Sequence, residues 1–156
     1  MKERKIIALV QEYRPDELPP QYCDIVDAAK AATKRSYAPY SKFHVGAAIR
    51  LENGEIVSGS NQENAAFSVT ECAERTACFY AASQYPGVPF KQIAIAAYTG
   101  GAFQKQPISP CGICRQALLE YEAMHKDDVE VILYGDEAVY VLPSVKSLLP
   151  LCFTEF

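Results

Sequence analysis

The chain has 156 residues, of which 49% are hydrophobic and 22% charged, with a formal net charge of −4 and a pI near 5.2. This length and composition predict one globular domain with a single core. The acidic balance argues against a nucleic-acid partner, and no stretch approaches the ~20 apolar residues that cross a membrane. We find no export signal near the start of the sequence, so we expect a cytoplasmic protein.

The predicted elements begin after an N-terminal extension, residues 1–20, which contains several prolines and favours a short helix or strand over residues 5–13. Apolar residues at helical spacing predict a helix over residues 21–36, which Pro39 ends. Alternating apolar residues predict a strand over residues 43–51. Asn53-Gly54 then predicts a hairpin turn, followed by an antiparallel strand over residues 56–60.

Helices and strands continue to the end of the chain. We expect helices over residues 73–83, 111–124 and 144–149, and strands over residues 93–98, 129–134 and 138–142. The last two strands are too close in sequence for a parallel crossover, so they must be antiparallel. The sum is a three-layer α/β/α fold with a five-stranded mixed sheet. The helix over residues 111–124 is expected to bury Ile113, Ala117, Leu118 and Tyr121.

Two cysteine clusters carry the chemistry, Cys72-Ala73-Glu74 and Pro110-Cys111-Gly112-Ile113-Cys114. Three thiolates can bind Zn²⁺ and leave its fourth position open, as in catalytic zinc sites. Water on such an ion becomes acidic enough to react near neutral pH, and Glu74 can move its protons. Because positions i and i+2 do not share a helix face, Cys72 must begin its helix for both side chains to reach one ion. Helix starts also favour thiolates.

The two clusters, in this order, resemble those of zinc-dependent nucleobase and nucleoside deaminases. In finer detail the chain resembles the homotetrameric zinc-dependent cytidine deaminases. The similarity is carried by residues 40–48, 61–65, 72–77 and 110–116, and more weakly by residues 148–153. It implies a cytidine deaminase domain over residues 21–156 with one Zn²⁺ per subunit. The implied reaction is hydrolysis of cytidine and 2′-deoxycytidine to uridine and 2′-deoxyuridine plus ammonia, in pyrimidine salvage.

The resemblance assigns roles at the metal. Cys72, Cys111 and Cys114 would bind zinc, and Glu74 would protonate N3 of cytosine and then the leaving amine. Arg75 would donate to the cysteine sulfurs and offset the negative charge of the three thiolates. A surface ion pair is the alternative for this arginine.

The resemblance also implies a substrate pocket. Asn61 and Glu63 would hold the ribose 3′-hydroxyl, which selects a free nucleoside over a strand. Phe43 would pack beside the base, although its strand pattern equally suits the core. Phe153 of a neighbouring subunit would cover the pyrimidine, so active sites would be shared in the homotetramer.

Two residues depart from the family pattern. Glu71 stands at a position that is more often uncharged in the family, and its carboxylate would either act on the bound water or face solvent. Phe67 stands where the family often has tyrosine, so a hydrogen bond from that hydroxyl would be lost.

Three alternatives remain open at this point. The substrate could be a modified or antibiotic cytosine nucleoside, as in the related blasticidin deaminases. Cys111 and Cys114 alone could form a thioredoxin-like redox pair. His44 or His125 could complete a structural zinc site without turnover. The sequence does not decide between ribo- and deoxyribonucleosides.

Overall fold

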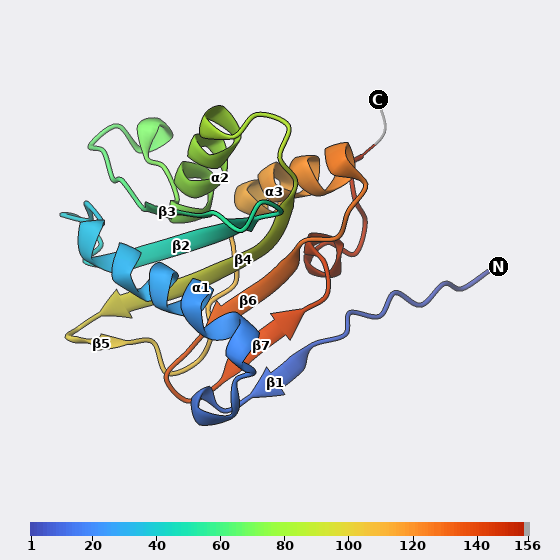
Figure 1. Cartoon of the computed structure of the whole chain (residues 1–156), viewed down its shortest axis with the longest axis horizontal. Helices are drawn as coiled ribbons and strands as arrows, with labels where there is room; N and C mark the ends of the chain where they lie inside the picture. Colours follow the sequence, from blue (N-terminus) through green and yellow to red (C-terminus); the bar gives the residue numbers. More distant parts are fainter. Residues whose placement is uncertain (155–156) are drawn as a thin grey trace.

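The structure, a computed structural model, describes residues 1–154, so the last two residues of the predicted domain 21–156 lie outside the described residues. It is an α/β fold with helices on both faces of a mixed sheet (Figure 1). In chain order the elements are β1 (Gln11–Tyr13), α1 (Pro20–Ala32), β2 (His44–Leu51), β3 (Ile56–Ser60), α2 (Ala73–Gln84), β4 (Phe90–Thr99), β5 (Ala102–Phe103), α3 (Gly112–His125), β6 (Glu130–Tyr134) and β7 (Val139–Leu142). Short 3-10 helices span Pro15–Glu17, Thr33–Arg35, Phe67–Val69 and Val145–Leu148.

The sheet has seven strands in the order β1-β7-β6-β4-β2-β3, with β5 paired to β4, so the prediction of five strands was wrong. The two strands beyond these five, β1 and β5, have 3 and 2 residues, too few to show an alternating pattern. β1 lies within residues 5–13, where a short helix or strand was expected, whereas β5 was not expected. They form because they meet the edges of β7 and β4. The antiparallel pairing of β6 with β7 was predicted and is confirmed, and β4 with β6 is the parallel pair.

The predicted hairpin between β2 and β3 is present, but its loop is longer than two residues. Leu51 N–H donates to the Glu55 carbonyl at 2.9 Å, and Gly54 adopts a φ of +89°. That left-handed conformation is the one that favours glycine.

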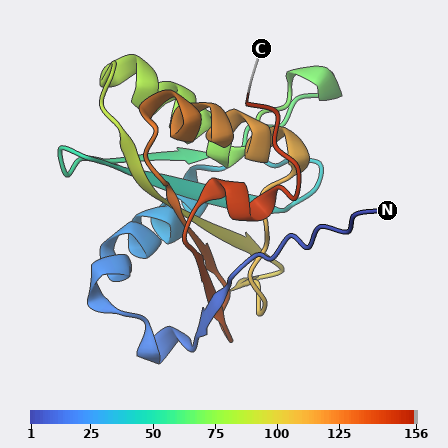
Figure 2. The same cartoon turned by 90° about the vertical axis from the view of Figure 1, so that its right-hand side faces the viewer.

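Each face of the sheet packs against its own helices (Figure 2). Helix α1 covers one face through Tyr22, Ile25, Val26 and Ala29, which are buried with residues of β4, β6 and β7. Helices α2 and α3 cover the other face. No helix within residues 1–154 is long and apolar enough to cross a bilayer.

The buried face of α3 differs from the predicted one. Its buried residues are Cys114, Leu118, Leu119 and Glu122, whereas Ile113 is 65% exposed. Burial of Ile113 was therefore a wrong prediction. The first turn of α3 instead directs Cys114 inward, toward the start of α2.

Candidate active site

The three thiols come together at the starts of two helices. Cys72 is the N-cap residue of α2, Cys111 is the N-cap residue of α3, and Cys114 lies in the first turn of α3. Their sulfur atoms all lie within 4.8 Å of one another, and those of Cys111 and Cys114 are 3.5 Å apart. Both helix starts fall where the spacing argument predicted them. The backbone N–H groups and dipoles at these starts favour thiolates.

The surroundings of the thiols suit a metal cation. A hydrogen bond with Cys114 lowers the pKa of the Cys72 thiol to about 6, with a further contribution from Arg75. The same bond, together with burial, raises the pKa of Cys114. Three sulfur ligands from separate chain segments are typical of a zinc site with one open position. Among the described residues, no histidine or carboxylate joins this group, so neither His44 nor His125 completes a closed cage.

Glu74 is a buried carboxyl group beside the thiols. It is only 5% exposed, and burial raises its pKa to about 7, with the negative charge of Cys72 adding to the effect. Its position in the first turn of α2 places it on the same wall as Cys72. A carboxyl group of this kind can donate and accept protons near neutral pH.

Both Cys72 and Glu74 line a cavity with a volume of about 440 Å³. This volume lies in the usual range of ligand pockets, about 300–1,000 Å³. The other lining residues come from three loops and from the starts of β2 and α2: Ser41, Phe43, Val45, Asn61, Glu63, Thr70, Glu71, Ala73, Ile108, Ser109 and Cys111. The cavity therefore unites two of the three candidate metal ligands, Cys72 and Cys111, with three of the four candidate substrate-binding residues, and the third ligand, Cys114, is buried beside them.

The fourth candidate, Phe153, lies outside this cavity in the single chain. Its side chain is 64% exposed, and its backbone carbonyl accepts a hydrogen bond from Gln116 Nε2 at 3.0 Å.

Asn61 is fixed by bonds to the scaffold. Its Oδ1 accepts from Val45 N–H at 2.8 Å and from Ser36 Oγ at 2.5 Å, while its Nδ2 donates to the Phe43 carbonyl at 2.9 Å. These bonds hold the start of β2, and with it Phe43, at the cavity wall. The side chain of Asn61 thus has a positioning role that the sequence did not reveal.

Glu63 ties another loop to the cavity. Its Oε2 accepts from the backbone N–H groups of Tyr40 and Ser41, at 2.8 and 3.3 Å. A hydrogen bond from the Ser41 side chain is the main reason that the pKa of Glu63 lies below its usual value. Glu63 is therefore ionised and acts as an acceptor at the rim of the cavity.

Arg75 pairs with the unusual acidic residue Glu71. Arg75 Nε lies 2.7 Å from Glu71 Oε1, and the two side chains are 18% and 33% exposed. Arg75 also lowers the pKa of Cys72. The arginine thus bridges a thiol and a carboxylate at the cavity wall.

Comparison with known proteins places this geometry in a family. A family model described as "Cytidine and deoxycytidylate deaminase zinc-binding region" matches residues 20–126. The chain belongs to this family. It is 38% identical over 130 residues to a cytidine deaminase from Halalkalibacterium halodurans, covering 83% of this chain and 92% of that protein. It is also 49% identical over 98 residues to a cytidine deaminase from Sporosarcina psychrophila, covering 62% of this chain and 67% of the relative.

Solved structures of cytidine deaminases share the fold. The crystal structure of the Burkholderia pseudomallei protein matches with a TM-score of 0.70 and 41% identity, over 83% of this chain and 97% of that chain. The Mycobacterium tuberculosis protein matches with a TM-score of 0.68 and 28% identity, over 86% and 98% of the two chains. The chain is therefore a hydrolytic deaminase with a cytidine deaminase-like α/β fold, and the redox alternative is not supported.

One residue of this deaminase that sequence analysis did not single out holds the second cysteine cluster in place. Arg115 donates to the carbonyls of Pro110 and Leu148, each at 2.8 Å, and to Ser109 Oγ at 2.9 Å. It thereby fixes the backbone directly before Cys111. The position of Arg115 directly after Cys114 was visible in the sequence. Its hydrogen-bond partners were not predictable, because they lie in a loop and in a distant 3-10 helix.

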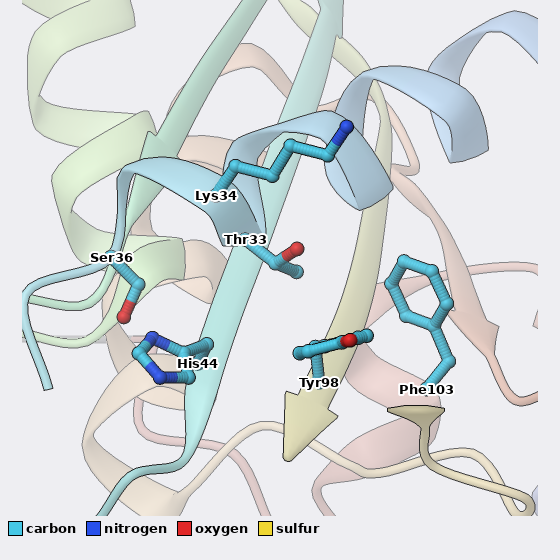
Figure 3. A pocket seen from close by; sticks show the side chains of 6 residues that line it. All are labelled: Thr33, Lys34, Ser36, His44, Tyr98 and Phe103. Carbon is cyan, nitrogen blue, oxygen red and sulfur yellow. The ribbon is translucent and has the colours of Figure 1, made fainter. Parts of the chain in front are cut away.

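A second cavity, of about 330 Å³, lies on the opposite face of the sheet (Figure 3). It is lined by Thr33, Lys34, Ser36, His44, Tyr98 and Phe103. His44 points into this cavity, whereas its neighbours Phe43 and Val45 line the cysteine-containing one. His44 and Phe43 therefore line two different cavities, one on each face of the sheet.

Proposed function

We propose that this deaminase hydrolyses cytidine and 2′-deoxycytidine to uridine and 2′-deoxyuridine with release of ammonia. The observation that carries the proposal is a cluster of three thiols, two of which line one cavity of nucleoside size together with a buried glutamate. The relatives named cytidine deaminase support the choice of substrate. A free nucleoside fits the net charge of −4 better than a polynucleotide does.

The residues divide the work as follows. Cys72, Cys111 and Cys114 would hold one Zn²⁺ per subunit, and the ion would supply an activated water at neutral pH. Glu74 would take one proton from the attacking water and deliver it to N3 of the base while a C4–O bond forms. It would then transfer the second proton to the amine, so that the C4–N bond breaks and ammonia leaves.

The surrounding residues orient the nucleoside. Glu63, an acceptor at the cavity rim, would receive the ribose 3′-hydroxyl, and Asn61 lines the same cavity. Phe43 offers an aromatic face for the pyrimidine. Arg75 offsets the negative charge of the thiolates, and Glu71 limits that effect by pairing with it.

We also infer a homotetramer with shared sites, in the cytoplasm and in pyrimidine salvage. Phe67 and Val69, close in sequence to the cavity residue Thr70, are 85% and 62% exposed in the single chain. Covering them, and placing Phe153 of another subunit over the base, would complete the pocket. Sedimentation equilibrium would test the tetramer, and a monomer with full activity would contradict it.

The decisive experiment combines metal analysis with a cytidine absorbance assay on pure protein. We expect about one zinc per chain, conversion of cytidine to uridine, and loss of activity after a strong chelator, with recovery on adding zinc. Zinc without turnover would indicate a structural site, and turnover without metal would contradict the proposed chemistry. Comparing kcat/KM for cytidine, 2′-deoxycytidine and blasticidin would separate ordinary from antibiotic substrates.

A further inference from the structure

The first ten residues form an arm outside the fold. They have no helix or strand and extend away from the sheet (Figures 1 and 2). Every one of them is exposed. The arm contains the apolar run Ile6–Val10, in which Ile7 is 85% and Leu9 64% exposed. β-branched and aliphatic residues in an extended run favour strand pairing, and such an exposed run in water marks an interaction site.

The arm lacks a partner strand in its own chain for a clear reason. It continues β1, which pairs with β7 in the register Gln11 to Val141. That register would bring Val10 to Leu142 and Leu9 to Pro143, but β7 ends at Leu142. Proline has no N–H to donate, and the chain then turns into the 3-10 helix Val145–Leu148.

The outer side of β1 is also available. β1 stands at one end of the strand order, so it pairs on one side only with β7 among the described strands. An open edge strand is a template for pairing with another chain. The arm and β1 together offer such an edge from about residue 4 to residue 12.

The sequence of this edge is complementary to itself in one register. Two residues directly opposite each other in a sheet point to the same face. A two-fold axis normal to the sheet keeps each residue on its face, so the axis must pass between one residue and the same residue of the second copy. Centring on Ala8 pairs Ile7 with Leu9, Ile6 with Val10, and Arg4 with Glu12 of the second copy. The pairs up to Ile6–Val10 are then apolar, Lys5 faces the polar Gln11, and the outer pair is of opposite charge.

The neighbouring registers lack this match. Centring on Ile7 would oppose Lys5 to Leu9, and centring on Leu9 would oppose Ile6 to Glu12. Each would place a charged side chain directly opposite an aliphatic one and so lose an apolar cross-strand pair. Charge and hydrophobic complementarity thus select both the partner, a second copy of this chain, and the register.

We propose that residues 4–12 of two copies pair as antiparallel strands about a two-fold axis at Ala8, joining two sheets edge to edge. The arm lies outside residues 20–126, which the deaminase family model matches, so this contact does not rest on the proposed reaction. It gives the N-terminal extension a role in assembly.

Cysteine cross-linking of the zinc-loaded protein tests the contact. Ala8→Cys would place two thiols on Cα atoms about 4.5–5.5 Å apart, within the range that a disulfide spans. We expect oxidised glutathione to convert this variant to a covalent dimer on a non-reducing gel. Cytidine turnover should remain at the wild-type level.

The matched control is Ile6→Cys, on the same face of the strand. In the proposed register its two copies lie about 13 Å apart, too far for a disulfide. The double variant Ile6→Cys with Val10→Cys should cross-link again, because these residues oppose each other. Equal cross-linking of Ala8→Cys, Ile6→Cys and the wild type would overturn the proposal. That result would mean that the arm does not pair with its own copy in this register, and it would favour pairing with another protein or with another strand edge.

Charge reversal gives a second, independent test. Arg4→Glu or Glu12→Arg alone should weaken the Ala8→Cys cross-link, by about two- to fivefold in the association constant for each pair lost. Combining both reversals should restore it. A double variant as weak as the singles would show that Arg4 does not face Glu12 and would overturn the register.

Discussion

Glu74 combines burial with a place beside three thiols, where its carboxyl group shares a hydrogen bond with Cys114. Because it is only 5% exposed and lies on the same wall as Cys72, we assign it the proton transfers. Glu74→Gln preserves shape and removes the acid–base group, so kcat should fall by about 10²–10⁴-fold. Zinc content, measured by atomic emission, should stay at the wild-type level. Turnover within tenfold of the wild type would contradict the assignment.

Glu63 has two tasks that a pair of variants can separate. Its Oε2 holds the loop at Tyr40 and Ser41, and the carboxylate faces the cavity. Glu63→Ala removes both, and we expect the KM for cytidine to rise about tenfold or more. Glu63→Gln keeps an oxygen for the loop and should raise KM less. Equal KM values for both variants and the wild type would exclude contact with the ribose; zinc content serves as the control.

Glu122 is the most buried charge among the described residues, at 0% exposure, and it joins three segments. Its carboxylate accepts from Val129 N–H at 3.0 Å, from Val145 N–H at 2.7 Å and from Ser144 Oγ at 2.7 Å. Glu122→Ala would leave these buried donors without acceptors, at a cost of about 3–5 kcal/mol in unfolding free energy. Urea titration would measure it. The exposed neighbour variant Glu120→Ala should change stability little, and a similar loss in both would contradict this role.

The residues of the site differ in how far sequence predicted them. The two cysteine clusters were predictable because their spacing describes a local geometry, a thiol at the start of a helix. This applies to Cys72 with Glu74 and to Cys111 with Cys114. The scaffold bonds of Arg115 and Glu122 connect segments that only the folded chain brings together. A glutamate on an apolar helix face is, by composition alone, indistinguishable from a surface charge.

At the scale of elements, helix α2 depends on a glycine in β3. A Cβ atom at Gly59 would lie 2.4 Å from the Ala77 nitrogen and 2.8 Å from the Ala73 carbonyl oxygen, both in the backbone of α2. Gly59→Ala must therefore push α2 off the sheet, at about 1–3 kcal/mol in unfolding free energy. Because α2 carries Cys72 and Glu74, zinc affinity should fall as well.

The matched control for that variant is Gly112→Ala in the first turn of α3. Nothing lies within 4 Å of a Cβ at this position, although it is next to Cys111. We expect unchanged or slightly higher stability and normal zinc binding, since alanine favours helices over glycine. Chemical denaturation and a competitive zinc titration would compare the two variants. Equal effects would show that crowding against α2 is not the cause.

Helices and strands with a strong apolar periodicity were predictable from the sequence, whereas elements with a weak periodicity were not. The strands over residues 43–51 and 129–134 were expected from apolar patterns, and β2 and β6 lie within one residue of these bounds. The short strands β1 and β5 exist only by pairing with neighbours. Burial of Ile113 was wrongly predicted for α3. The apolar pattern alone does not show that the first turn must direct Cys114 inward to reach Cys72, which leaves Ile113 exposed.

At the scale of the whole molecule, the metal site connects two helices that cover the same face of the sheet. Cys72 starts α2, whereas Cys111 and Cys114 start α3, and these helices are in contact. An ion bound to all three thiols closes a link between segments that the unfolded chain does not hold together. Zinc binding should therefore stabilise the fold, because only the native state presents the complete ligand set.

Removal of zinc should lower the unfolding temperature accordingly. A ligand at 100 times its Kd stabilises by about 2.7 kcal/mol, which for a domain of this size corresponds to about 5–10 °C. Calorimetry of chelator-treated and zinc-reconstituted protein would measure the difference. Cys114→Ser, which lacks one thiolate, should respond to zinc much less than the wild type does. If stripping leaves the wild-type transition unchanged, the thiols do not hold the ion as a shared link between α2 and α3.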